Sequence, residues 1–247
     1  KLTRTTILPE GIDNRMKKLA ILGASYLQLP LLVKAREYGI ETHCFAWDNE
    51  DAVGKTAADF FYPISVLDTE KILETCTRIQ IDGITTIATD ICIPVIAHIA
   101  EKLNLISNDP ETAFRSTNKL AMRAAFLKSG IRSPRFIAID KNSNDSFNDF
   151  SFPLIVKPTD RSGSRGVFKV ENRAELPAAI SKAFEESIEK KAVVEEFIEG
   201  AEISVECLSW QGKHFLLAIT DKITTGAPHF VELQHHQPAQ FSLEMQQ

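Results

Sequence analysis

The stretch PLIVKPTDRSGSRGVFKV, residues 153–170, combines residue types that bind anions. Lys157 ends an apolar run, and the loop that follows holds Ser162, Gly163, Ser164 and Gly166. Glycines let backbone N–H groups approach an anion closely, while lysine and serine side chains add donors. Each charge-assisted hydrogen bond of this kind contributes about 1.5–3 kcal/mol. Alone, the stretch fits two interpretations: an anion-binding loop, or a hairpin loop with a solvated lysine.

Two other segments favour a nucleotide as the anion. Lys119 follows a predicted helix cap in STNKLAMRAAF, and AVVEEFIEGAEISVE spans residues 192–206. Four residues at the end of a predicted strand suit a flat base: Glu195, Glu196, Phe197 and Ile198. They offer hydrogen bonds and apolar walls, and Glu202, beyond a glycine turn, can accept hydrogen bonds from sugar hydroxyls. Two lysines, a glycine loop and this strand together predict a nucleotide site.

Two well-known glycine motifs are not found in the sequence. GKT at residues 54–56 lacks the glycine that a P-loop needs five residues earlier, where Asn49 stands. The first predicted strand is followed by GASYLQ, which has one glycine in place of the dinucleotide-binding fingerprint. The sequence therefore disfavours a P-loop enzyme and a nicotinamide-dependent dehydrogenase.

Apolar runs and helical patterns alternate along residues 16–106, in the order expected of a parallel sheet with crossover helices. We expect a helix cap at Asp68 or Thr69 and a short last strand at residues 105–106. Residues 1–15 have no clear periodicity and are interpreted as a leader or extension.

The pattern changes in residues 107–247. Two successive helices are predicted there, the first capped by Asp109 and the second by Thr117 or Asn118. Mainly antiparallel strands around one helix follow. The predicted fold class is thus α/β and then α+β.

Composition narrows the class of protein. The 247 residues are 44% hydrophobic and 25% charged, with a net charge of -5, which suits an ordinary globular protein and argues against nucleic-acid partners. The four cysteines are scattered, so a reducing, cytoplasmic setting is expected. The apolar stretch at residues 16–35 is interrupted by Gly23, Gln28 and Pro30, which disfavours a signal peptide, and we expect no membrane span.

The order of NK…MR, PLIVKP, SGSRGV and VVEEFIEGAEISVE resembles the ATP-grasp superfamily, and the opening domain resembles its usual partner, the pre-ATP-grasp domain. Within the superfamily the chain is most similar to carboxylate–amine ligases and carbamoyl-phosphate-synthase-like proteins. The resemblance implies a pre-ATP-grasp domain at residues 16–106 and an ATP-grasp domain at residues 107–247, with residues 134–196 as its lid.

Site roles also follow from the resemblance. It implies that Lys119 and Lys157 contact the ATP phosphates and that residues 162–166 form a flap over them. Glu195 would bind the adenine amino group, with the backbone of Glu196, Phe197 and Ile198 lining the base, and Glu202 would hold the ribose. ATP would phosphorylate a small-molecule carboxylate, and an amine would attack the acylphosphate. A homodimer is compatible with the family.

The sequence departs from the family near its end. The Mg²⁺ ligands of the family, a glutamate and a Glu-x-Asn strand with a nearby arginine, are expected beyond residue 247, so no metal ligand is assigned here. We expect an incomplete ATP-grasp domain with weak or no activity by itself. A bicarbonate-using, carbamoyl-phosphate-type or carboxylase enzyme and a non-catalytic ATP-binding protein stay open as alternatives.

Two acidic residues are candidates for the substrate side. Asp90 follows a predicted parallel strand, at the sheet edge where open α/β sheets bind ligands, but it also suits a helix cap. Glu232 is either a residue of the acceptor pocket or an exposed strand residue.

Overall fold

The computed structural model describes residues 15–143, 147–227 and 230–240. The chain forms two compact units, residues 1–117 and 118–247, which are described separately. All but one of the residues assigned to the leader, 1–14, lie outside the described part. The boundary between the units falls at Thr117, after the first of the two successive helices, whereas the predicted domain boundary lies before that helix.

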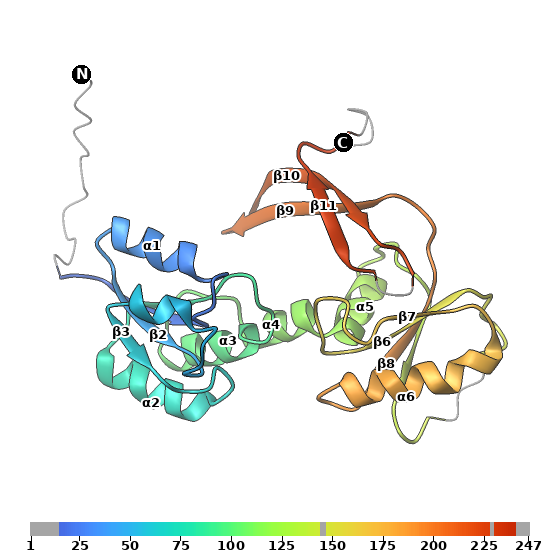
Figure 1. Cartoon of the computed structure of the whole chain (residues 1–247), viewed down its shortest axis with the longest axis horizontal. Coiled ribbons are helices and arrows are strands. Elements are labelled where there is room, and N and C mark those ends of the chain that lie inside the picture. The colour runs from blue at the N-terminus through green and yellow to red at the C-terminus, as the bar shows by residue number, and fades with distance from the viewer. Residues whose placement is uncertain (1–14, 144–146, 228–229, 241–247) are drawn as a thin grey trace. The chain divides into compact units, whose positions relative to one another are not determined.

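The first unit contains a four-stranded parallel sheet (Figure 1). Its strands are β1 (Lys18–Leu22), β2 (Glu41–Phe45), β3 (Phe60–Tyr62) and β4 (Gly83–Thr85), in the order β3-β2-β1-β4. Every neighbouring pair runs parallel, which confirms the predicted parallel sheet. The three-residue strand β3 was not predicted from the sequence.

Helices cover both faces of this sheet. Helix α1 (Leu29–Glu37) packs on one face, and α2 (Thr69–Ile79) and α3 (Ile93–Lys102) pack on the other. Helix α4 (Pro110–Thr117) packs against α3, and a 3-10 turn, η1, spans Val53–Thr56. Successive strand residues face opposite sides, so Ile21 of β1 packs with Leu32 of α1, whereas Leu22 packs with Ile72 of α2 and Ile99 of α3. Burial on both faces explains the continuous apolar run of β1, from Leu19 to Leu22.

The predicted caps at Asp68, Asp109 and Asn118 are confirmed: each side chain accepts a hydrogen bond from a backbone N–H of the first helical turn. The short strand expected at residues 105–106 was wrong. The backbone N–H of Leu105 donates to the carbonyl of Ala100 at 2.8 Å, so this segment closes the end of α3 instead of pairing with the sheet.

The second unit contains an antiparallel sheet of β5 (Phe136–Ile139), β6 (Leu154–Pro158), β7 (Phe168–Val170) and β8 (Ala192–Glu196), in the order β5-β8-β6-β7. Helix α5 (Lys119–Lys128) precedes these strands, and the 3-10 turn η2 (Arg173–Glu175) leads into α6 (Leu176–Glu186). Leu154, Val156 and Val194 pack with Ala183 of α6, so this helix covers one face of the sheet (Figure 1).

A second antiparallel sheet follows, with β10 (Lys213–Thr224) between β9 (Glu202–Trp210) and β11 (Glu232–His236). Most of its side chains are exposed, including the apolar side chains of Val205, Leu216 and Leu217. Leu216 and Leu217 are neighbours on β10, at a register irregularity where the pairing with β9 passes from Leu216–Cys207 to Ala218–Glu206. Among the helices of the described residues, none combines the length and the apolar character that a bilayer span requires.

Close packing explains the glycine of the GKT sequence. The backbone N–H of Gly54 donates to the carbonyl of Ala24 at 2.7 Å, and a Cβ atom here would lie 2.8 Å from Leu32 Cδ1 and 3.0 Å from the Ala24 oxygen. We expect Gly54→Ala to lower the free energy of unfolding by about 1–3 kcal/mol, because a methyl group overpacks this contact. Denaturant unfolding measures the change. The exposed neighbour Val53, changed to Ala, is the control and should shift it by less than about 0.5 kcal/mol.

Candidate functional site

Strand register places Lys157 and Glu195 on the same face of the sheet in the second unit. Lys157 of β6 pairs with Val193 of β8, and Ile155 pairs with Glu195, so Lys157 and Glu195 are diagonal neighbours. The intervening residues Val156 and Val194 point to the opposite face, toward α6. The lysine Nζ donates to Glu195 Oε2 at 2.7 Å. One face of these strands therefore serves the core, and the other carries charge.

Arg123 of α5 holds the same carboxylate. Its Nε donates to Glu195 Oε1 at 2.8 Å, and its Nη2 donates to Oε2 at 3.1 Å. The Glu195 side chain is only 3% exposed, and those of Arg123 and Lys157 are 18% and 16% exposed. A carboxylate this deeply buried is stable only when it is paired and hydrogen-bonded. Glu195 thus joins α5, β6 and β8 at one point.

The two basic groups control the ionisation of this cluster. Burial by itself would raise the pKa of Glu195, but the hydrogen bonds from Arg123 and Lys157 and their positive charges hold that pKa below the ordinary glutamate value. Burial lowers the pKa of Lys157, with a smaller contribution from the charge of Arg123, while Glu195 opposes this shift. Glu195 is therefore ionised at neutral pH.

Lys119 lies at the start of α5, beside the loop that follows β6. Its backbone N–H donates to the carbonyl of Thr159 at 2.8 Å, and its Nζ donates to the carbonyl of Arg161. Thr159 comes two residues after Lys157 in the chain. The structure thus brings both predicted phosphate-binding lysines to the β6 end of the loop.

The loop itself, residues 162–166, is a tight turn between β6 and β7. Gly163, Ser164 and Gly166 all have positive φ, between 57° and 71°. At Gly166 a Cβ atom would also lie 3.1 Å from Pro158 Cδ and 3.1 Å from Glu186 Cβ, so a side chain there would crowd these neighbours and also strain the backbone. The Ser164 hydroxyl donates to the carbonyl of Phe230 at 2.8 Å, and Ser162 is exposed.

The residues after Glu195 differ in whether their backbone N–H groups are hydrogen-bonded. Glu196 forms an ion pair with Arg135 at 2.6 Å, and its N–H donates to the Arg135 carbonyl at 3.1 Å. The N–H of Phe197 donates to the carbonyl of Pro153 at 3.3 Å. Within the described residues, the N–H of the exposed residue Ile198 is the first beyond β8 without a protein acceptor. A ligand at this strand end would therefore meet the backbone at Ile198.

The remaining two acidic candidates of this unit lie together. Lys222 of β10 is 3.6 Å from Glu202 Oε2 of β9 and 2.7 Å from Glu232 Oε1 of β11. His235 lies 3.3 Å from the other oxygen of Glu232. The structure thus links the predicted ribose residue and a predicted substrate residue through one lysine. The exposed side chain of Glu202 also accepts from the Thr224 hydroxyl at 3.4 Å.

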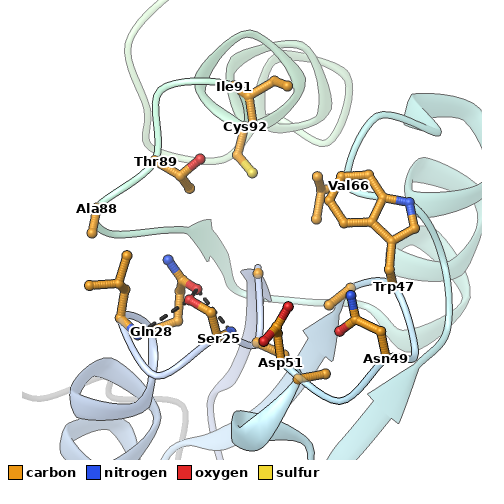
Figure 2. Close-up of a pocket in the computed structure, with 15 residues that line it drawn as sticks. Ser25, Gln28, Trp47, Asn49, Asp51, Val66, Ala88, Thr89, Ile91 and Cys92 are labelled. Carbon is orange, nitrogen blue, oxygen red and sulfur yellow. Dashed lines mark hydrogen bonds between the residues drawn. The ribbon is translucent and has the colours of Figure 1, made fainter. Parts of the chain in front are cut away.

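Asp90 lies in the first unit, in the loop after β4. Its neighbours Thr89 and Ile91 line a cavity of this unit, but Asp90 is not among the lining residues (Figure 2). Its carbonyl accepts from the backbone N–H of Ile93 at 3.0 Å, at the start of α3. Its role on the substrate side stays a prediction.

Sequence reasoning did not identify Arg123 and Lys222, the cations that hold Glu195, Glu202 and Glu232. Arg123 stands in the MR pair of a predicted helix, and a surface arginine on a helix carries no signal of its own. Lys222 follows Asp221 in an alternating strand, where a solvated lysine is equally ordinary. The packing of α5 against the sheet shows that Arg123 faces Glu195, and the cross-strand register shows what Lys222 faces; a single sequence provides neither.

Comparison with known proteins finds a family match for part of the chain. Residues 150–247, which include Lys157, the loop and Glu195, match the ATP-grasp domain. An alanine–anticapsin ligase of Bacillus subtilis is 25% identical over 87% of this chain and 53% of its own length. The crystal structure of an L-amino acid ligase from Bacillus licheniformis superimposes with a TM-score of 0.77 and 26% identity, over 94% of this chain and 57% of that one.

The fold is shared more widely. An ADP complex of purK, an N5-carboxyaminoimidazole ribonucleotide synthetase, matches with a TM-score of 0.77 over 93% of this chain and 59% of that chain, at 16% identity. The chain spans about half or less of the length of the curated relatives that it matches. These comparisons confirm the resemblance inferred from the sequence: residues 150–247 match the ATP-grasp domain, and the solved structures that resemble the chain include an L-amino acid ligase and a synthetase.

Removing the Glu195 carboxylate should destabilise the folded protein. We expect Glu195→Ala to lower the free energy of unfolding by roughly 3–5 kcal/mol, because Lys157 and Arg123 would lose their shared counter-ion inside the protein. Denaturant unfolding at neutral pH measures the loss. The exposed Glu199→Ala is the matched control, with a change within about 0.5 kcal/mol. Equal effects of the two variants would contradict the structural role of Glu195.

Acid should weaken the same interaction. Since the folded pKa of Glu195 lies below its ordinary value, its stabilisation is complete above about pH 4.3 and is lost as the pH falls through that value toward the folded pKa. We expect the difference in unfolding free energy between the natural chain and Glu195→Gln to be constant from about pH 7 to 5 and to shrink below about pH 4. Unfolding curves measured at each pH test this. A difference that does not change with pH would show that the Glu195 charge is not involved.

Proposed function

We propose that this chain is the ATP-binding part of an ATP-dependent ligase that activates a carboxylate as an acylphosphate and joins it to an amine. The observation that carries the proposal is the pair of Lys157 and Glu195 on the sheet face opposite α6, together with the glycine loop that follows β6, inside the segment that matches the ATP-grasp domain. The similarity to an alanine–anticapsin ligase and to an L-amino acid ligase supports amide-forming chemistry.

The basic residues suit phosphoryl transfer. Lys119 and Lys157 would face the ATP phosphates, and the loop at residues 162–166 would cover them and exclude water. A carboxylate oxygen of the substrate would attack the γ-phosphorus, and the bond from that phosphorus to the bridging oxygen of ADP would break. The amine nitrogen would then attack the acyl carbon, with loss of a proton and of phosphate. Positive charge held at the phosphates stabilises the transferring group.

Glu195 retains room for one further hydrogen bond. A carboxylate offers about four acceptor positions, and Arg123 and Lys157 fill three of them. The fourth would accept from the adenine amino group, while the free N–H of Ile198 would donate to a ring nitrogen. Glu202, the first residue of β9, would accept hydrogen bonds from the ribose hydroxyls. These bonds would replace its 3.6 Å ion pair with Lys222.

The same proposal assigns a role to each unit and includes Mg²⁺ as a cofactor. We assign the parallel-sheet unit as a pre-ATP-grasp domain and the four-stranded antiparallel sheet with α6 as the lid. Mg²⁺ would accompany ATP in the whole protein. Within the described ranges, however, no three carboxylate, imidazole or thiol groups converge as a metal site, so no residue is assigned to it.

ATP binding tests the proposal directly. We expect the 247-residue chain to bind ATP with Mg²⁺, detected by calorimetry and by an increase in thermal stability, and to show no increase with NADH. Lys157→Ala should weaken ATP binding by more than about tenfold, because it removes one charge-assisted contact to the phosphates. Glu195 keeps its Arg123 partner in this variant, and thermal unfolding of the variant without ATP checks that it is folded.

Lys128→Ala is the control, because Lys128 is an exposed lysine at the end of α5. Its ATP dissociation constant should match that of the natural chain. An unchanged constant in Lys157→Ala, or equal losses in both variants, would refute the assignment of the phosphate site. In a longer gene product, ATP hydrolysis that depends on added bicarbonate instead of a carboxylate and an amine would favour the carboxylase alternative.

A further inference from the structure

The first unit has a cavity at one edge of its parallel sheet. Its volume is about 260 Å³, and the loops after all four strands contribute to it. The chain runs outward from β1 through β2 to β3 and then returns to β4 on the other side of β1. The crevice beside such a reversal, at the carboxyl ends of the strands, is where open α/β sheets bind ligands. Pockets for drug-sized molecules are roughly 300–1,000 Å³, so this cavity suits a smaller compound.

The walls of the cavity are largely apolar. Trp47 and Val66 stand at one side, and Ile91 and Cys92 lie across the hollow from the residues at its base (Figure 2). Val66 is buried, whereas Trp47 is 51% exposed and leaves its ring accessible. Burial raises the pKa of the Cys92 thiol to about 11, so this residue brings no negative charge. An apolar body of modest size fits these walls.

Two polar side chains of the cavity, Ser25 and Gln28, already form hydrogen bonds within the protein. The Ser25 hydroxyl donates to Gln28 Oε1 at 2.7 Å, and Gln28 Nε2 donates to the carbonyl of Ile87 at 2.7 Å. These bonds join the loops after β1 and β4 and fix the shape of the cavity. Gln28 is 3% exposed, so its amide is a structural element of the wall.

The carboxylate of Asp51 is different. It points toward the open centre of the cavity (Figure 2), and within the described residues it has no hydrogen-bond or ion-pair partner. The nearby Asp48, by contrast, is paired with Lys55 at 2.7 Å. The lining residues include no lysine, arginine or histidine. The only formal charge in the cavity is therefore negative, which opposes a phosphate or a carboxylate.

We propose that this cavity binds a small organic ammonium compound, with its cation between Asp51 and the Trp47 ring and its apolar part against Val66 and Ile91. A carboxylate attracts the ammonium group, and the face of an indole ring attracts it further. The Asn49 amide oxygen, beside Asp51 in the lining, offers one more acceptor. An amine is also the class of compound that the proposed ligase would consume, but this binding requires nothing of ATP.

Three probes with the same branched five-carbon skeleton test the charge preference: 3-methylbutylammonium, 3-methylbutanol and 3-methylbutanoate. The chain has two tryptophans, Trp47 and Trp210, so Trp210→Phe leaves Trp47 as the only indole reporter for a fluorescence titration at neutral pH. We expect the ammonium compound to bind about tenfold more tightly than the alcohol, and the carboxylate to bind most weakly. Equal binding of all three, tighter binding of the carboxylate, or no binding of any probe would overturn the proposal.

A pair of variants locates the cation. In Asp51→Asn the preference for the ammonium compound over the alcohol should disappear, and in the control Asp48→Asn it should persist. Loss of the preference in both variants, or in neither, would overturn the assignment to Asp51. ATP binding, measured in parallel, should be the same in both variants and in the natural chain. A failure of ATP binding with intact ammonium binding would refute the proposed function alone.

Discussion

The second unit depends on one carboxylate, that of Glu195. Its burial is tolerable only because Arg123 and Lys157 approach it from two elements, α5 and β6. Once these contacts form, the start of α5 is fixed beside the end of β6, where the Lys119 N–H meets the Thr159 carbonyl. The glycine loop leaves the sheet at the same place. A single desolvated charge therefore sets the positions of both predicted phosphate-binding lysines.

A second charged cluster in the same unit has the opposite ratio of basic to acidic side chains. In the first cluster two basic side chains share the Glu195 carboxylate, whereas on the three-stranded sheet Lys222 lies between two carboxylates, Glu202 and Glu232. The first cluster has a formal surplus of positive charge and suits an anion. The second, with His235 beside it, has a formal surplus of negative charge and suits hydroxyls or a cation.

Periodicity and capping were enough to predict the classes of both units. The parallel sheet follows from apolar strands alternating with amphipathic helices, and Asp68, Asp109 and Asn118 start the helices that they were expected to start. The predictions failed for short segments. Strand β3 has three residues, too few to show a period, and was not predicted. Leu105 was predicted in a strand but bonds to the end of α3 through its backbone N–H, which no side-chain pattern reveals.

The candidate site was predicted only in part, for a physical reason. Lys157 and Glu195 stand at strand ends flanked by recognisable residues, whereas Arg123 and Lys222 matter through what faces them in space. The cavity of the first unit was missed for the same reason, because Trp47, Asp51 and Ile91 come from separate loops. Motifs that lie along the chain are visible in a sequence, and convergence between distant loops is not.

The alternation of β6 and β8 has a consequence for how this protein can change over time. Leu154, Val156 and Val194 belong to the core beneath α6, while their immediate neighbours Ile155, Lys157 and Glu195 face the other side. Packing and chemistry are thereby assigned to alternate codons of the same short segments. Evolution can remodel the core and the ligand-facing surface independently by substitution, but a single-residue insertion in either strand would exchange the two roles at once.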